Sequence, residues 1–392
     1  MPKVLRIINR FNLGGPTYNA AYLSKYLDPK YETLLIGGQK DESEGSSEYI
    51  VKNLGLEPII IPEMRREISP KNDYIAYKKI KKIIAEFKPD IVHTHASKAG
   101  TLGRLAAFQS NVPVVVHTFH GHVFHSYFGK LKTTFYKNIE RYLAKKSTRI
   151  IAISEKQKEE LSAEHAICGA HKIDVIPLGF DLNRFTENQE EKRKSFRSLY
   201  NINDQEIAIA IVGRLVPVKN HRFFLDAVQN IAAKEKLPIR VFIVGDGELK
   251  EELIEYTKQL GLDYSLTPEK RATVHFTSWI KEVDVVYAGV DIAALTSFNE
   301  GTPVSLIEAQ AASKPIVSTR VGGIENIVLE NKTALLSDSG DLTTFVSNLK
   351  SLIINAESLT KFGEEGKQFA LTKFSYQRLC SDVSTLYDKL LF

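Results

Sequence analysis

Two carboxylates eight positions apart have the spacing that most clearly points to chemistry. Glu300 and Glu308 flank the turn-forming triplet Gly301-Thr302-Pro303, and a helical pattern of apolar residues follows from Val304. Pro303 fits the first turn of a helix, because the N–H that proline lacks needs no partner there. We therefore expect Glu300 in the loop that precedes a helix and Glu308 one to two turns inside it.

The start of this helix provides hydrogen-bond donors between the two acids. The N–H groups of Thr302, Val304 and Ser305 have no acceptor within the helix, and together with the helix dipole they attract anions. A ligand that crosses the segment would meet an acid, a group of donors and a second acid. This order matches the polyol, diphosphate and ribose diol of a sugar nucleotide. The alternative interpretation is two exposed glutamates on either side of a buried helix.

Basic residues follow a strand-like run in the same half of the chain. Arg214 comes soon after the apolar run 207–212, and Lys219 lies five positions later. Two fixed cations at a strand end would stabilise the negative charge that develops on a diphosphate leaving group. A solvated pair of basic residues is the other interpretation.

The elements that position these residues follow an alternating pattern. Short apolar runs typical of buried parallel strands alternate with helical patterns, such as the one over 69–87, where Ser69 is a predicted N-cap. This pattern predicts an α/β fold with two Rossmann-like domains in tandem, residues 1–185 and 186–374, and a linker zone near 187–197. The predicted strands are 4–8, 33–36, 58–61, 90–93, 112–116, 149–153, 207–212, 239–244, 274–276, 291–295 and 316–318.

Composition excludes several classes of protein. The 392 residues are 43% apolar and 25% charged, which is typical of a folded globular chain and not of a disordered one. No apolar run reaches the roughly 18 residues of a membrane-spanning helix, and the first residues indicate a strand and a glycine turn rather than a signal peptide. Cys168 and Cys380 have no metal-binding or redox spacing, so we expect a cytoplasmic protein.

Several motifs together resemble one enzyme family. Glu300 and Glu308, followed by Lys314-Pro315-Ile316-Val317 and Val321-Gly322-Gly323, are similar to the donor motif of glycosyltransferase family 4, although Ser313 stands where the family usually has glycine. The resemblance implies the GT-B fold, in which two Rossmann-like domains with parallel sheets face each other across a cleft. It also implies that a C-terminal helix, within 375–392, packs back on the first domain.

The resemblance further implies a reaction and its residues. It implies a retaining, metal-independent transfer of a sugar from a nucleotide-diphosphate sugar, with a UDP-sugar as the favoured donor and no cofactor. Glu300 would bind the donor sugar's hydroxyls, Glu308 the ribose diol, and Arg214 and Lys219 the diphosphate, while His120 would hydrogen-bond to the sugar. Together His120, Glu300, Arg214 and Lys219 form the predicted catalytic set. Further donor-binding residues are expected at Gly14, Gly15, Gly245, Trp279, Thr302, Pro303, Val304 and Ser305. Trp279 could instead have a core or surface role, and Gly245 could be a plain turn.

Histidines gather in the first predicted domain, at His93, His95, His117, His120, His122 and His125. No cysteine or carboxylate accompanies them as in a typical zinc site, so no metal is expected. His95 and Lys98 are predicted on the acceptor side, because Lys98 lies at the start of a helix beside His120. The alternative is that they are satisfied polar residues at a strand end.

Residues 122–149 carry seven lysines and arginines against one acid, interleaved with aromatic residues. A basic aromatic helix fits an anionic membrane surface, and positions 131, 135, 139 and 142 give an apolar face that could instead pack on the sheet. The acceptor is therefore expected to be a lipid-linked or polysaccharide precursor at the inner face of a membrane. No recognition motif for nucleic acid accompanies the charge. Two alternatives stay open: a GT-B sugar-nucleotide epimerase, and a non-catalytic sugar-nucleotide-binding or scaffold protein.

Overall fold

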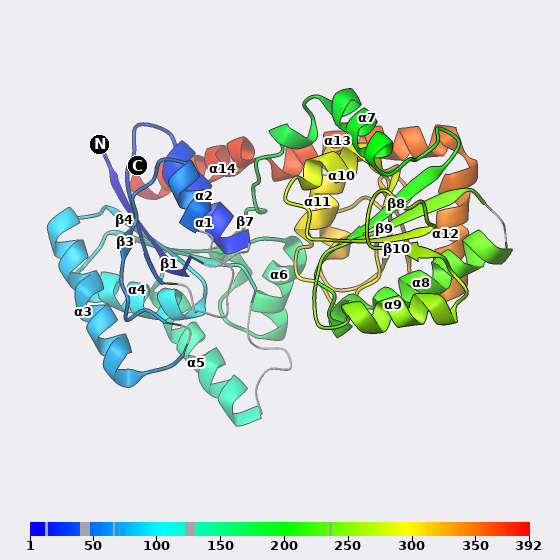
Figure 1. Ribbon diagram of the computed structural model, residues 1–392. Coiled ribbons are helices and arrows are strands. Elements are labelled where there is room, and N and C mark those ends of the chain that lie inside the picture. The colour runs from blue at the N-terminus through cyan, green and yellow to red at the C-terminus, as the bar shows by residue number, and fades with distance from the viewer. Residues whose placement is uncertain (12–14, 40–47, 66, 122–129, 235–236) are drawn as a thin grey trace. The chain divides into compact units, whose positions relative to one another are not determined.

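The computed structural model describes the chain except residues 12–14, 40–47, 66, 122–129 and 235–236 (Figure 1). The described residues form two compact units, Met1–Phe180 with Lys373–Phe392 and Asp181–Thr372. In the described part, each unit contains one seven-stranded sheet, and its neighbouring strands pair in parallel. The predicted class, α/β with two tandem Rossmann-like domains, is confirmed.

The sheet of the first unit has helices on both faces, as Figure 1 shows. Its strand order is β3-β2-β1-β4-β5-β6-β7. The strands are β1 (Lys3–Arg10), β2 (Glu32–Gly38), β3 (Ile59–Ile60), β4 (Ile91–His95), β5 (Val114–Phe119), β6 (Arg149–Ala152) and β7 (Ile173–Val175). The main helices are α1 (Gly15–Tyr26), α2 (Glu48–Asn53), α3 (Pro70–Phe87), α4 (Ser97–Gln109), α5 (Lys130–Lys146), α6 (Glu155–Glu159) and α14 (Tyr376–Leu391).

Strand alternation assigns these helices to opposite faces of the sheet. Val4, Ile91 and Val114 pack with residues of α1 and α14, whereas their neighbours Leu5 and Val92 pack with residues of α3 and α4. Successive side chains of a strand point to opposite faces, so both faces of β1 and β4 are buried. The C-terminal helix α14 is therefore part of this unit's core.

The second unit repeats the arrangement around a core of its own, with strand order β10-β11-β9-β8-β12-β13-β14. Its strands are β8 (Ile207–Val212), β9 (Ile239–Val244), β10 (Tyr264–Ser265), β11 (Val274–Ser278), β12 (Ile292–Leu295), β13 (Ile316–Thr319) and β14 (Ala334–Ser337). The helices are α7 (Gln189–Leu199), α8 (His221–Gln229), α9 (Lys250–Gln259), α10 (Val283–Gly289), α11 (Val304–Ala311), α12 (Leu342–Ile354) and α13 (Ala356–Phe374).

Two local predictions differ in outcome. Ser69 caps α3, since its hydroxyl accepts from the Asn72 N–H at 3.5 Å, as predicted. The charged stretch 187–197, by contrast, is not a linker but forms most of α7. Its charges are compatible with a packed helix because Arg193 and Arg197 pair with the buried carboxylate of Asp291 at 2.7 and 3.3 Å.

Candidate functional site

Each sheet has a point where the strand order reverses, and ligands of open parallel sheets bind outside the carboxyl ends of the strands at that point. In the second unit the reversal lies between β8 and β12, because β9 continues on one side of β8 and β13 on the far side of β12. Arg214 and Lys219 follow β8, and Glu300 follows β12. Sheet topology thus brings these predicted residues to one edge.

Glu300 lies in the loop after β12 and is held by an ion pair. Its Oε1 lies 2.5 Å from Nζ of Lys219 and accepts a second hydrogen bond, also 2.5 Å, from the hydroxyl of Ser297. The Phe298 N–H donates to the carbonyl of Val218 at 2.8 Å, which joins this loop to the turn that carries the lysine. The acid and the cation therefore form a fixed, mostly buried pair.

The paired glycines after β13 are required by close contact with this loop. Gly322 has φ +55°, and a Cβ there would lie 1.9 Å from the carbonyl oxygen of Glu300. A Cβ on Gly323 would lie 1.8 Å from the carbonyl oxygen of Gly301, and the Gly323 N–H donates to the Glu300 carbonyl at 2.9 Å. The glycine pair thus supports the backbone of the acidic loop.

Gly245 has a similar supporting position. Its φ is +150°, and a Cβ there would lie 1.9 Å from the carbonyl oxygen of Gly213, directly before Arg214. Its N–H donates to the Ser278 carbonyl at 3.0 Å, which ties the loop after β9 to the end of β11. Trp279 follows at once and is 57% exposed. The indole is therefore a surface group beside these loops and not part of the core.

The helix α11 begins one residue later than predicted. Pro303 is its N-cap residue, with φ −71° and ψ 99°, and Val304 is the first helical residue. In the described part of the chain, the N–H groups of Thr302, Val304 and Ser305 donate to no protein acceptor. The side chain of Arg214 is exposed and makes no ion pair with any described residue. A free cation and free amide donors suit an anion.

Glu308 lies on α11 with its side chain 21% exposed. Partial burial raises the pKa of Glu308 to about 7; Arg184, 4.0 Å from its Oε1, acts in the opposite direction, and the charge of Asp284 adds to the increase. Asp284 is itself paired with Lys192 at 3.0 Å. Burial also raises the pKa of the neighbouring Tyr287. A partly buried carboxyl group whose pKa is raised to near neutral pH is typical of a functional site.

In the first unit, His120 follows β5 and contacts His95 at the end of β4. The Nε2 of His120 lies 2.9 Å from Nδ1 of His95, and the rings are 5.2 Å apart. His95 is completely buried, whereas His120 is partly exposed. Burial lowers the pKa of His120 to about 3 and that of His95 well below its ordinary value. Both rings are therefore neutral at physiological pH.

The remaining predicted residues of this unit are placed as follows. Lys98 lies in the first turn of α4, and its ammonium pairs with Asp73 at 2.5 Å and donates to the carbonyl of Glu67. The lysine is thus directed toward α3. Gly15 is the first residue of α1. Gly14 lies outside the described residues, as do His122 and His125.

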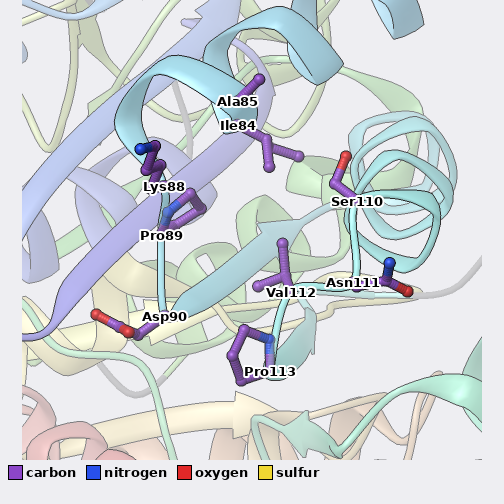
Figure 2. A pocket seen from close by; sticks show the side chains of 9 residues that line it. All are labelled: Ile84, Ala85, Lys88, Pro89, Asp90, Ser110, Asn111, Val112 and Pro113. Atoms are coloured by element: carbon purple, nitrogen blue, oxygen red, sulfur yellow. The ribbon is translucent and has the colours of Figure 1, made fainter.

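Neither a metal cluster of described residues nor the pocket in Figure 2 coincides with these residues. Among the described residues, no three His, Cys, Asp or Glu side chains are grouped to hold a metal ion. This pocket has a volume of about 430 Å³. Figure 2 shows that it is lined by the loops that precede β4 and β5, including Asp90 and Pro113. It lies at the amino ends of these strands, whereas ligands of parallel sheets bind at the carboxyl ends.

Comparison with known proteins decides the family. The family model for group 1 glycosyl transferases matches residues 192–369, and that for glycosyltransferase family 4 matches residues 13–184. The chain is 32% identical over 292 residues to the UDP-Gal:alpha-D-GlcNAc-diphosphoundecaprenol alpha-1,3-galactosyltransferase of Escherichia coli, which covers 74% of this chain and 73% of the relative. The chain is a group 1 glycosyltransferase.

Two further comparisons agree with this assignment. The glycosyltransferase is 25% identical over 339 residues, 85% of each chain, to the capsular polysaccharide biosynthesis glycosyltransferase CapM of Staphylococcus aureus. Its structure is similar to the crystal structure of HepE from Anabaena in complex with UDP, with a TM-score of 0.81 and 18% identity over 99% of this chain and 100% of HepE. The predicted family and the GT-B fold class are confirmed.

Two residues near the candidate site of this glycosyltransferase were not predicted. Ser297 donates to Glu300 from three positions earlier, a spacing at which a hydroxyl and a carboxylate often meet in a turn. Arg184, near Glu308, has no local signal in the sequence, because its contact depends on how the segment before α7 packs beside α11. Among the described residues no helix is long and apolar enough to cross a membrane.

Proposed function

We propose that this glycosyltransferase moves a sugar from a UDP-sugar to a lipid-linked or polysaccharide-precursor acceptor, with retention of anomeric configuration and without a metal ion. The observation that carries the proposal is the polar edge at the β8–β12 reversal. There a fixed acid–cation pair, Glu300 with Lys219, accompanies Arg214 and the amides at the start of α11, for which the described part of the chain provides no ion-pair partner or acceptor.

Each group has a chemical role toward a sugar nucleotide. Arg214 and the amides of Thr302, Val304 and Ser305 would bind the diphosphate, and Lys219 has further N–H donors for it beyond the one directed at Glu300. Glu300 would accept from hydroxyls of the donor sugar, and Glu308 from the ribose diol. Pro303 would fix the entry to α11, and Trp279 would contact the base. Gly14 and Gly15 would allow close approach to the donor, Gly245 would support the loop of Arg214, and His120 would hydrogen-bond to the sugar.

The same groups support the proposed metal independence, and we propose a retaining reaction on the same face of the sugar. Arg214 and Lys219 would stabilise the charge that develops on the leaving diphosphate, which is the task a divalent ion performs elsewhere. As the bond between the anomeric carbon and the phosphate oxygen breaks, the acceptor hydroxyl forms the new bond on the same face. The leaving phosphate oxygen takes the hydroxyl proton, so no protein base is required.

The donor and acceptor are supported by the names of similar proteins. The Escherichia coli relative is named for UDP-Gal and for a diphosphoundecaprenol acceptor, and HepE was crystallised with UDP.

His95 and Lys98 lie at the carboxyl end of β4 and at the start of α4. We propose only that this edge of the first sheet lies near the acceptor.

We also propose that α5 contacts an anionic membrane surface. Two positions of the predicted apolar face are exposed to solvent: Phe135 is 62% exposed and Tyr142 50% exposed, whereas Ile139 is partly buried. Lys145 and Lys146 are exposed on the same helix. Exposed aromatic rings beside lysines suit the headgroup region of an anionic bilayer. Residues 122–129 of the predicted segment lie outside the described residues.

The first test is binding and turnover with a panel of UDP-, GDP-, ADP- and TDP-sugars. A ligand that binds only the folded state raises the melting temperature, so we expect a rise with a UDP-sugar that is lost in Glu308→Ala and Arg214→Ala. Arg222→Ala, which removes an exposed arginine paired with Glu252, is the matched control that should keep the rise.

Product analysis separates the alternatives. With a lipid-diphosphate-linked sugar as acceptor, we expect a new glycosidic bond with the donor's anomeric configuration, formed equally well in excess EDTA. Interconversion of the sugar nucleotide without an acceptor would indicate an epimerase instead. Binding of the donor without any turnover would indicate a non-catalytic binding protein.

A further inference from the structure

A row of polar side chains crosses the interior of the first unit, where a parallel sheet is normally apolar. Arg6 on β1, His93 and His95 on β4 and Thr118 on β5 are each at most 3% exposed. Arg6 is paired with His93 in the β1–β4 register, and His95 with Thr118 in the β4–β5 register. By strand alternation these side chains lie on the face covered by α1 and α14.

Arg6 anchors one end of this row without an acidic partner among the described residues. Its guanidinium donates to the Ser24 hydroxyl at 3.2 Å, the Leu23 carbonyl at 3.1 Å and the Tyr387 hydroxyl at 3.1 Å. It also lies 3.2 Å from Nδ1 of His93. A guanidinium can only donate, so Nδ1 of His93 is the acceptor. The remaining ring proton is then on Nε2, which donates to the Thr118 hydroxyl at 2.7 Å.

His93 in turn fixes His95. Their rings are stacked, with centroids 4.3 Å apart and planes at 28°. The hydroxyl of Tyr387, from the C-terminal helix α14, lies 2.6 Å from Nδ1 of His93 and holds that ring in place. Burial, together with the charge of Arg6, lowers the pKa of His93 well below its ordinary value, so the stack consists of neutral imidazoles. Neutral stacked rings have no charge repulsion to separate them.

His95 connects the row to His120. Its Nδ1 lies 2.9 Å from Nε2 of His120, and since both imidazoles are neutral, a single proton joins these two nitrogens. The other ring nitrogen of His120, Nδ1, is buried and has no hydrogen-bond partner among the described residues, and the same holds for Nε2 of His95. Whether that Nδ1 donates or accepts depends on which ring carries the shared proton.

We infer that His95 is a positioning residue for His120: it fixes the ring orientation and the tautomer with which Nδ1 of His120 meets a donor-sugar hydroxyl. This inference rests on the proposed role of His120. Because the ring of His95 is fully buried, we assign His95 this positioning role and not a direct contact with the acceptor. The row Arg6–His93–His95 supplies the rigidity, and Tyr387 makes that rigidity depend on the docking of α14.

The test uses nuclear magnetic resonance of protein labelled with ¹⁵N-histidine, because imidazole ¹⁵N shifts report the tautomer directly. Three variants of His95 are compared. Asparagine places its amide near the position of Nδ1, glutamine places it near Nε2, and alanine removes it. We expect His95→Asn to keep the His120 ring signals of the unchanged protein, whereas His95→Ala and His95→Gln shift them and populate a second tautomer.

Kinetics on the same variants give the functional readout. Loss of one orienting hydrogen bond should lower kcat about tenfold in His95→Ala. The Kd for UDP should not change, and His95→Asn should recover most of kcat. If His95→Ala does not fold, as judged by circular dichroism, the comparison of asparagine with glutamine carries the same test.

The outcomes separate this inference from the proposed function. Unchanged His120 signals in His95→Ala, or in His95→Gln where alanine does not fold, would overturn the positioning role, whatever the enzyme's activity. If the His120 signals shift in the His95 variants but His120→Ala retains full turnover, the contact between the two rings is upheld. The role of His120 in transfer is then refuted.

Discussion

At the scale of single residues, the candidate site combines charges that are already compensated with charges that are not. Lys219 and Glu300 neutralise each other at 2.5 Å, whereas Arg214 makes no ion pair within the described residues and Glu308 has only a distant partner in Arg184. Uncompensated groups lower the stability of the free protein and become satisfied when a ligand binds, so they identify where binding free energy is gained.

Glu308 gives the clearest test of this idea. Its pKa rises from the ordinary 4.5 to about 7 on folding. The folded state therefore binds more protons than the unfolded state between these values, so its stability falls as pH rises from about 4.5 to about 7 and stays at the lower level above 7. We expect Glu308→Gln to increase the free energy of unfolding at pH 8 by about 2 kcal/mol and so to raise the melting temperature. The substitution should also remove most of this pH dependence.

The same substitution should weaken UDP binding by about tenfold or more, because a charge-assisted hydrogen bond to the ribose diol is lost. Melting curves from pH 5 to 9 and calorimetric titration with UDP measure the two effects. Arg184→Ala is the complementary control: without the cation the pKa of Glu308 should rise further, so the variant should be less stable than the unchanged protein at pH 8. Equal melting temperatures for Glu308→Gln and the unchanged protein at pH 8 would contradict the argument.

The pair of Lys219 and Glu300 should be coupled in stability. Removing one partner leaves the other charge mostly buried, so Lys219→Ala and Glu300→Ala should each destabilise the fold by about 1–3 kcal/mol. The double variant should lose less than the sum of the single losses. Urea denaturation of the four proteins measures the coupling, and simple additivity would show that the two groups act independently.

At the scale of elements, the site depends on loops that contact each other through their backbones. The loop after β13 touches the loop after β12 at Gly322 and Gly323, and the loop after β9 touches the loop after β8 at Gly245. In each case a carbonyl oxygen occupies the position that a Cβ would need. Glycine is therefore required by packing between loops as well as by backbone conformation.

Gly322→Ala tests whether glycine is required at this position by the close contact between the two loops. Its φ is +55° and its Cβ would lie 1.9 Å from a backbone oxygen, so the acidic loop must move. We expect a loss of stability of about 2 kcal/mol or more and a large loss of UDP affinity. Gly301→Ala, where an added Cβ meets nothing within 4 Å, should leave the melting temperature nearly unchanged. A similar fall in both variants would contradict the contact argument.

At the scale of the whole molecule, positive charge is concentrated on one face of the first unit. Helices α3, α4 and α5, which pack on the same side of the sheet, contain thirteen lysines and arginines and three acids, although the net charge of the chain is only +5. Figure 1 shows these three helices beside one another. Tyr74 and Tyr142 are exposed on this face, which adds α3 to the proposed membrane contact of α5.

Replacing Lys78, Lys81, Lys145 and Lys146 by alanine should weaken binding to vesicles with anionic phospholipid, because each lysine near such a surface contributes about 1 kcal/mol. Four such changes predict a reduction of more than a hundredfold at low salt. A control variant with alanine at four exposed lysines of the second unit, Lys194, Lys281, Lys332 and Lys361, has the same net charge. Vesicle sedimentation compares them, and equal binding would rule out this face.

The sequence by itself determined the helices and strands, and it determined which polar residues follow the carboxyl ends of strands. Strand and helix periods are local properties, so the tandem α/β fold could be predicted from them, and Arg214 and Glu300 could be placed after strands. The spacing of Glu300 and Glu308 is likewise encoded within one loop and one helix.

Only the tertiary structure decided which groups meet. Strand order brings the loop after β8 beside the loop after β12 and so pairs Lys219 with Glu300, and no local pattern specifies that order. Likewise the packing of α14 on the first sheet brings Tyr387 to His93, and burial makes His95 a neighbour of His120 and not an exposed ligand. Local periodicity specifies elements, whereas contacts between distant residues depend on how the elements pack.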